Sequence, residues 1–288
     1  MDTGLLIALI PMLTWGSVGL VSNLLGGNAN QQTLGMTLGG FVFACGTVLL
    51  VHPVITFRTF VIGLVTGVFW TIGQNGQFHG MQALGLSLAL PLSTGSQLMV
   101  NTLAGVFLFH EWKTTRDIYL GVAALVCLIL GIIFTARQDQ ASEHKEEIDF
   151  PVGLRTIFLS TIGFACYTIA VNWSKVDPFA VILPQSIGMV AGAAYLNGKR
   201  LALDHYVRAN ILTGLLWGVG NIAMLYAMRT IGLAVSFSLS QMGIVISTLG
   251  GIFLLGEKKT KKELRNIIFG SLLVIAGGIL LGILKVGA

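Results

Sequence analysis

Long stretches without Asp, Glu, Lys or Arg restrict the fold of this chain more than any other feature. The two longest lie between Asp2 and Arg58 and from Thr59 to His110, and six shorter ones follow. A helix needs about 20 apolar residues to cross a bilayer, so the pattern predicts two helices in each long stretch and one in each shorter stretch. A charged fraction of only 10% excludes an ordinary soluble domain. We therefore expect an all-α polytopic membrane protein with about ten transmembrane helices.

The only long polar segment, "RQDQASEHKEEIDFP", covers residues 137–151 and is predicted to be a linker. It would divide the chain into a first unit, residues 1–136, and a second unit, residues 152–288. The expected helices occupy residues 4–25, 33–52, 59–79, 84–109 and 116–136 in the first unit, and 153–174, 178–197, 208–228, 232–255 and 265–285 in the second.

The two units contain similar segments at nearly constant spacing. "GVFWTIGQ", which begins at Gly67, matches "GLLWGVGN", which begins at Gly214, and "TLAGVFLFHE", ending at Glu111, matches "TLGGIFLLGE", ending at Glu257. Chance similarity between apolar runs is the alternative, but the recurring tryptophans and acids favour a repeat. Because each copy has five helices, an odd number, the second must be inverted relative to the first. Inverted repeats are typical of secondary transporters that work by alternating access.

The formal charge of +5 comes with basic residues in short loops, which indicates membrane topology rather than nucleic-acid binding. Arg58 and Lys113 favour a cytoplasmic N-terminus, whereas Lys199 and Arg200 favour the opposite orientation for the second unit. We expect both termini in the cytoplasm, because the first helices usually dominate. The first helix is expected to stay as a signal anchor. The cysteines lie in apolar runs and are expected to be buried and unpaired: Cys45, Cys127 and Cys166.

A polar and aromatic helix face is predicted in the third helix. Trp70, Gln74 and Gln77 have the spacing i, i+4, i+7, and Trp217 and Asn221 repeat the first two positions in the second unit. Amides can exchange hydrogen bonds with neighbouring hydroxyls while an indole covers the apolar face of a sugar ring. These five residues are candidate substrate contacts. The alternative is that the amides hold helices together, as they often do in membranes.

A second polar cluster lies in the fourth and ninth predicted helices. Ser93, Gln97 and Asn101 have the spacing i, i+4, i+8, and Ser240 and Gln241 lie in the matching segment. We expect Ser93, Gln97, Ser240 and Gln241 to contact substrate, although such serines can also bond to their own helix. Further candidates for the lining of the cavity are Tyr167 and Gln185, and Trp15 corresponds in position to Phe164.

No carboxylate lies in the middle of a predicted span. Glu111 and Glu257 lie at helix ends before basic residues, so structural ion pairs are expected, but these two residues, His79 and His110 are the available carriers for proton coupling. The sequence contains no phosphate-binding glycine loop, metal-ligand spacing or nucleophile elbow. An enzyme, an ATP-driven pump, a cofactor and a bound metal are therefore not expected.

The motifs "WTIGQ", "PLSTGSQL", "SFSLSQ" and "STLGGIFLLGE" resemble the glucose/ribose porter family of the drug/metabolite transporter superfamily, and most closely its bacterial glucose uptake proteins. The resemblance covers essentially the whole chain. It implies facilitated or proton-linked uptake of glucose across the bacterial plasma membrane. It also implies substrate contact at Trp70, Gln74, Ser93, Gln97, Trp217, Asn221, Ser240 and Gln241.

Several alternatives remain open at this stage. A ribose porter of the same fold fits the same side chains. Small multidrug exporters carry a glutamate in the first helix, and sugar-phosphate exchangers need buried Lys or Arg; this chain has neither. A membrane sensor without transport activity is a further alternative. The expected partners are a small sugar, membrane lipid and, for symport, protons, with no nucleic acid.

Overall fold

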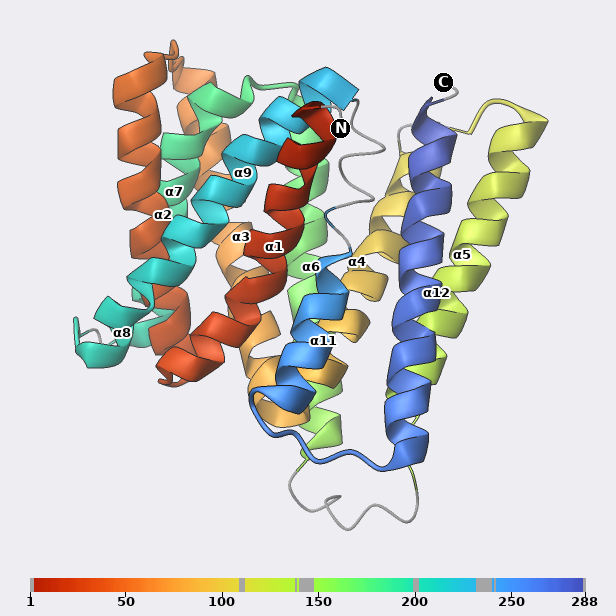
Figure 1. The fold of residues 1–288 in the computed structure, drawn as a ribbon. Coiled ribbons are helices and arrows are strands. Elements are labelled where there is room, and N and C mark those ends of the chain that lie inside the picture. The colour runs from red at the N-terminus through yellow and green to blue at the C-terminus, as the bar shows by residue number, and fades with distance from the viewer. Residues whose placement is uncertain are drawn as a thin grey trace.

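A computed structural model describes residues 3–108, 112–137, 139, 148–198, 202–231, 240 and 242–286, and among these it contains helices and no strands (Figure 1). In chain order the helices are α1 (Thr3–Leu25), α2 (Ala29–Val51), α3 (Phe57–Leu84), α4 (Leu86–Phe107), α5 (Thr115–Ala136), α6 (Phe150–Ser174), α7 (Pro178–Asn197), α8 (His205–Ala209), α9 (Ile211–Ile231), α11 (Gly243–Phe253) and α12 (Lys261–Val286).

Six of these helices are long and apolar enough to cross a bilayer: α2, α3, α5, α6, α7 and α12. Large apolar side chains such as Leu50 and Phe158 are exposed on them, 84% and 65% respectively, which suits contact with lipid. The chain is therefore a multi-pass membrane protein. Ten spans remain a prediction, because α4 and α9 are not among these six and α1 and α11 have only shorter apolar segments in the described part of the chain.

Local capping moves several helix ends from their predicted positions. α2 begins at Ala29 rather than at residue 33, because Asn28 and Gln31 form a capping box. α3 continues to Leu84, beyond its predicted end at residue 79. Gly85 then separates it from α4 with a φ of +83°, a conformation that glycine adopts without a steric penalty.

The eighth and ninth predicted helices also differ from the structure. The helix predicted at residues 208–228 is α9, Ile211–Ile231, and the short α8, His205–Ala209, which Asp204 caps, precedes it. The ninth predicted helix, residues 232–255, is represented by α11 and by Ser240, which is helical, because residues 232–239 and 241 lie outside the described part.

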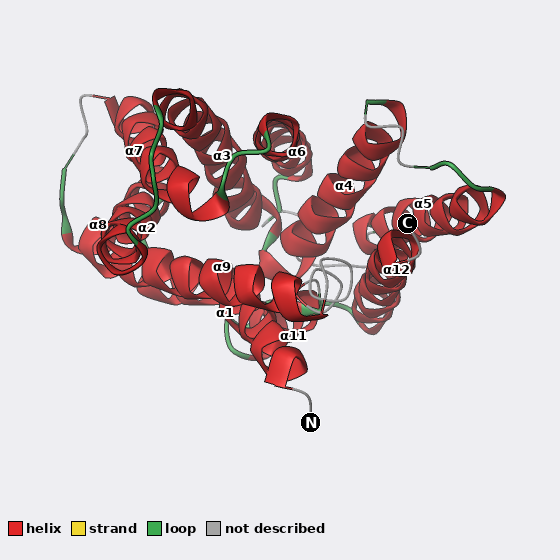
Figure 2. Cartoon of the chain, turned by 90° about the horizontal axis from the view of Figure 1, so that it is seen from above, coloured by secondary structure: helices red, strands yellow, loops and turns green. Residues whose placement is uncertain are grey.

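Helices from the first half of the chain pack against helices from the second half. α3 packs against α6 and α7, α9 packs against α1 and α2, and α5 packs against α12. In Figure 2, α5 and α12 lie at one end of the bundle and α2 and α7 at the other. α1 begins and α12 ends at the top of Figure 1, whereas α5 ends and α6 begins at the bottom.

Two glycines allow the closest of these helix contacts. A Cβ atom at Gly67 of α3 would collide with the backbone oxygen of Gln185 in α7, and one at Gly214 of α9 would collide with that of Met36 in α2. Small residues at helix contacts let the backbones approach, and in lipid this close packing replaces the hydrophobic effect as a source of stability. The two contacts hold α3 close to α7 and α9 close to α2.

Candidate functional site

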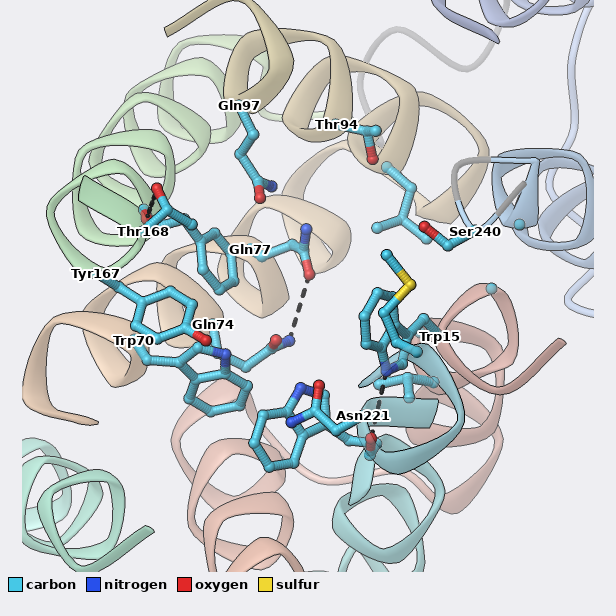
Figure 3. A pocket seen from close by; sticks show the side chains of 18 of the residues that line it. Trp15, Trp70, Gln74, Gln77, Thr94, Gln97, Tyr167, Thr168, Asn221 and Ser240 are labelled. Atoms are coloured by element: carbon cyan, nitrogen blue, oxygen red, sulfur yellow. Dashed lines mark hydrogen bonds between the residues drawn. The ribbon is translucent and has the colours of Figure 1, made fainter. Parts of the chain in front are cut away.

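A cavity of about 490 Å³ lies between the helices, and side chains from both halves of the chain line it (Figure 3). The two tryptophans predicted as equivalent meet there. The ring centroids of Trp70 and Trp217 are 5.1 Å apart, and their planes are tilted by 58°. Phe164 presents its ring to Trp70 at 6.2 Å in an edge arrangement, and the indole nitrogen of Trp15 donates to the backbone oxygen of Trp217 at 3.3 Å. The four rings form an aromatic part of the lining.

Three amides and one hydroxyl form a hydrogen-bonded chain along α3 and α4. The Nε2 of Gln74 donates to Oε1 of Gln77 at 3.3 Å, and the Nε2 of Gln77 donates to Oγ of Ser93 at 2.8 Å. The Nε2 of Gln97 donates to the same Ser93 oxygen at 2.9 Å. Gln74, Gln77 and Gln97 line the cavity, whereas Ser93 is fully buried behind them. We call these four residues the amide network.

A second polar pair joins α4 to α6. The hydroxyl of Thr168 donates to Oδ1 of Asn101 at 2.7 Å, and both residues line the cavity. Asn221 of α9 points into the cavity from the opposite side to Gln97 (Figure 3). Among the described residues that line the cavity there is no Asp, Glu, Lys, Arg or His. The site therefore offers neutral donors and acceptors beside aromatic rings.

The amide-rich stretch of α3 has a second polar face that binds the start of α2. The side chain of Asn75 donates to Oδ1 of Asn30 at 2.8 Å, and Gln82 donates to the backbone oxygen of Gly27 at 3.1 Å. His79 is exposed, lies 3.4 Å from the same Asn30 oxygen and does not line the cavity. On this face the amides hold helices together, which was the alternative to substrate binding, and His79 is remote from the cavity.

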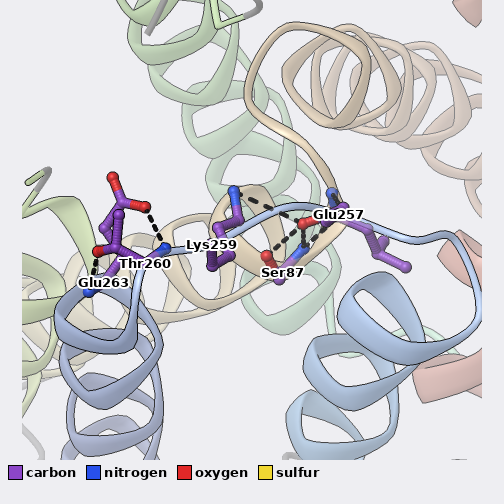
Figure 4. Close-up of polar contacts among 6 residues, drawn as sticks. Ser87, Glu257, Lys259, Thr260 and Glu263 are labelled. Carbon is purple, nitrogen blue, oxygen red and sulfur yellow. Dashed lines mark hydrogen bonds and ion pairs between the residues drawn. The ribbon is translucent and has the colours of Figure 1, made fainter. Parts of the chain in front are cut away.

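Glu257 caps the start of α4, a helix of the other half of the chain (Figure 4). Its carboxylate accepts the backbone N–H of Leu86 at 2.5 Å, the N–H of Ser87 at 3.2 Å and the hydroxyl of Ser87. The first N–H groups of a helix have no partner within it and carry a partial positive charge, so a carboxylate suits this position. Lys259 lies 3.7 Å from the same carboxylate. The expected ion pair with a basic neighbour is present, but the capping of α4 was not foreseen.

Of the nine predicted substrate contacts, seven line the cavity: Trp70, Gln74, Gln77, Gln97, Trp217, Asn221 and Ser240. Ser93 lies directly behind the lining. Gln241, Glu111 and His110 lie outside the described residues. The two further candidates for the lining, Tyr167 and Gln185, also line the cavity, and so do Trp15 and Phe164, which were predicted only to correspond in position.

Other lining residues were not predicted from the sequence. Thr94 lies three positions before Gln97 and seven before Asn101, and Thr168 lies four positions after Phe164, so both could have been found from helical spacing. Met36, Met81 and Met224 could not, because a methionine in an apolar helix looks the same whether it faces lipid or a cavity.

Comparison with known proteins gives one family. The family model described as "Sugar transport protein" matches residues 6–284. A protein of Enterococcus faecalis named "Putative sugar uptake protein" is 54% identical over 284 residues, which cover 98% of this chain and 99% of that protein. A protein of the same name from Lactiplantibacillus plantarum is 47% identical over the same length and with the same coverage.

Comparison with solved structures gives matches that include a crystal structure similar to the whole chain. It covers 100% of this chain and 99% of its own, with a TM-score of 0.62 and 15% sequence identity. At this level of identity the similarity shows the fold alone.

Proposed function

Because the chain belongs to the sugar transport protein family, we propose that it takes up a neutral monosaccharide, and glucose in particular, across the bacterial plasma membrane. The observation that carries this proposal is the cavity between the two halves, lined by uncharged amides and aromatic rings. A sugar presents hydroxyls around its edge and C–H groups on its face, and these match amides and indoles respectively. A cationic drug or a sugar phosphate would lack a countercharge among the described lining residues.

We propose alternating access between two inverted repeats, residues 1–136 and 152–288, joined by the linker 137–151. The packing partners support this arrangement. α3 packs against α6 and α7 as α9 packs against α1 and α2, so exchanging the two halves preserves these contacts. The predicted pairs Trp70 with Trp217 and Gln74 with Asn221 lie on the same cavity, as expected for a site near a pseudo-two-fold axis. We also propose that both termini of the chain lie in the cytoplasm.

Uptake is driven by the sugar gradient or coupled to protons. Proton coupling requires a titratable group whose protonation changes the balance between conformations. Among the described candidates Glu257 suits this role better than His79, because its carboxylate joins the end of α11 to the start of α4. Glu111 and His110 remain candidates on the sequence alone.

The test is uptake of labelled glucose into proteoliposomes that contain the purified protein, with and without an inward proton gradient. Ribose is added as a competitor in a parallel series. Saturable uptake that the gradient accelerates and ribose leaves unchanged would support a glucose and proton symporter. Competition by ribose would favour a ribose porter of the same fold. No flux of either sugar above that of empty vesicles would overturn the proposal and favour a sensor or an exporter.

A further inference from the structure

Ser93 receives two hydrogen bonds at one oxygen. The Nε2 atoms of Gln77 and Gln97 lie 2.8 and 2.9 Å from its Oγ, and the serine is fully buried. A hydroxyl has two acceptor positions and only one hydrogen. The serine can therefore donate to at most one of the two amides, and at least one amide must point its NH2 group toward it.

The orientation of these amides decides what they offer to a ligand. In a planar amide the oxygen and the NH2 group lie on opposite sides of the terminal carbon. When the NH2 group of Gln97 points to Ser93, its oxygen turns away from the serine, at the cavity (Figure 3). The Nε2 of Gln74 is held in the same way by Gln77, which leaves the Gln74 oxygen available. Gln74 and Gln97 both line the cavity.

We propose that Ser93 is a positioning residue that sets the polarity of the substrate site. By holding the NH2 groups of the amide network, it presents amide oxygens to the sugar, so this wall recognises substrate hydroxyls as hydrogen-bond donors. The inference rests on the proposed function and goes beyond it, because it assigns the direction of the hydrogen bonds. It also assigns a role in specificity to a residue that does not line the cavity.

Fluorinated sugars test this direction. Replacing a hydroxyl by fluorine removes the donor and keeps a weak acceptor of similar size. We expect at least one singly fluorinated deoxyglucose to compete with labelled glucose about tenfold more weakly than glucose itself, the cost of one unmade hydrogen bond. The assay is the proteoliposome uptake described above, with each hydroxyl replaced in turn.

Variants of the amide network test whether it causes the weaker competition by fluorinated glucose, which we call the fluorine penalty. In Ser93→Ala both amides can turn their NH2 groups to the sugar, so we expect the fluorine penalty to shrink to about twofold or less, because the amide can now donate. Gln97→Leu should abolish the penalty at the position that it contacts. The control Ser96→Ala changes a serine on the same helix that does not line the cavity, and should keep the full penalty.

The outcomes separate this inference from the proposed function. Glucose uptake with no fluorine penalty at any position, or with a penalty unchanged in Ser93→Ala, would overturn the inference and leave the function intact. Absence of uptake of both sugars by the unmodified protein would overturn both. Where Ser93→Ala does not fold, Ser93→Cys replaces the hydroxyl by a weak acceptor and should likewise shrink the penalty, whereas Ser93→Thr keeps the hydroxyl and should keep it; a full penalty in Ser93→Cys would overturn the inference.

Discussion

The two halves of the chain line the cavity with the same spacing but with different chemistry. α4 contributes Thr94, Gln97, Leu98 and Asn101, and Ser240 together with α11 contributes residues 240, 243, 244 and 247 at a constant offset of 146 positions. Gln97 corresponds to a glycine in the second half. On α3 and α9 the offset is 147, and there Gln77 corresponds to Met224.

At the matching positions the second half thus has neither of the two amides that donate to Ser93 in the first half. The aromatic contacts are preserved, since Phe164 packs on Gly73 as Trp15 packs on Gly220. A monosaccharide also has a polar edge and an apolar face, and it has no two-fold symmetry. The comparison shows that both halves line the cavity with aromatic and polar residues, whereas the glutamines that donate to Ser93 come from the first half.

The largest expected effect comes from replacing Gln77, in the wall of the cavity that the first half forms, by the residue at the matching position of the second-half wall, Met224. Gln77→Met removes both a donor to Ser93 and an acceptor for Gln74. We expect kcat/KM for sugar uptake to fall about 30-fold, because Gln77 no longer contacts the sugar and Gln74 is no longer held in place, so two substrate hydrogen bonds at about 1 kcal/mol each are lost. The reverse exchange, Met224→Gln, should stay within about threefold, because the network of the first wall is untouched.

Uptake kinetics in proteoliposomes measure both variants, with thermal unfolding in detergent to verify that each is folded. Equal losses in Gln77→Met and Met224→Gln would contradict the difference between the two walls.

The second prediction concerns the close helix contacts that both halves make through a glycine. Gly67→Ala and Gly214→Ala each place a methyl group against backbone atoms of a neighbouring helix, so neither clash can be relieved by a side-chain rotation. We expect each to lower the stability by about 2 kcal/mol, the usual cost of overpacking. Gly46→Ala is the control, because a Cβ atom there would meet nothing within 4 Å.

The measurement is the midpoint of thermal unfolding in detergent. A lower unfolding midpoint in only one of the two glycine variants would show that the helix contacts, like the lining of the cavity, differ between the halves.

The smallest expected effect concerns the contact between the halves at the start of α4. Glu257→Gln keeps an acceptor oxygen but removes the negative charge from the N-terminus of the helix. We expect a loss of about 1 kcal/mol, the usual size of a charge interaction with a helix end. Lys258→Gln, at an exposed neighbouring position, should have almost no effect. A Glu257→Gln protein as stable as the unmodified one would mean that the charge does not stabilise this contact.

The helix period explains which parts of the site could be predicted. Trp70, Gln74 and Gln77 share a face because i, i+4 and i+7 positions lie above one another, so their common direction followed from the sequence. Asn75 and His79 lie on another face of the same helix, and their partner at the start of α2 is far away in the chain. Spacing along one helix predicts which side chains point the same way, but it does not identify the residue on another helix that each side chain contacts.

The sequence by itself determined that this chain crosses a membrane as helices, that two of those helices carry matching tryptophan and amide positions, and that the chain belongs to a family of sugar transport proteins. Hydropathy and period suffice for the first two, since both are local properties, and the match of residues 6–284 to the family model gives the third. Only the tertiary structure decided that Gln77 of α3 donates to Ser93 of α4 and that Glu257 caps α4. Each of these contacts joins residues far apart in the chain, so the packing of the helices decides which donors meet which acceptors, whereas Gln97 and Ser93 are one turn apart on the same helix.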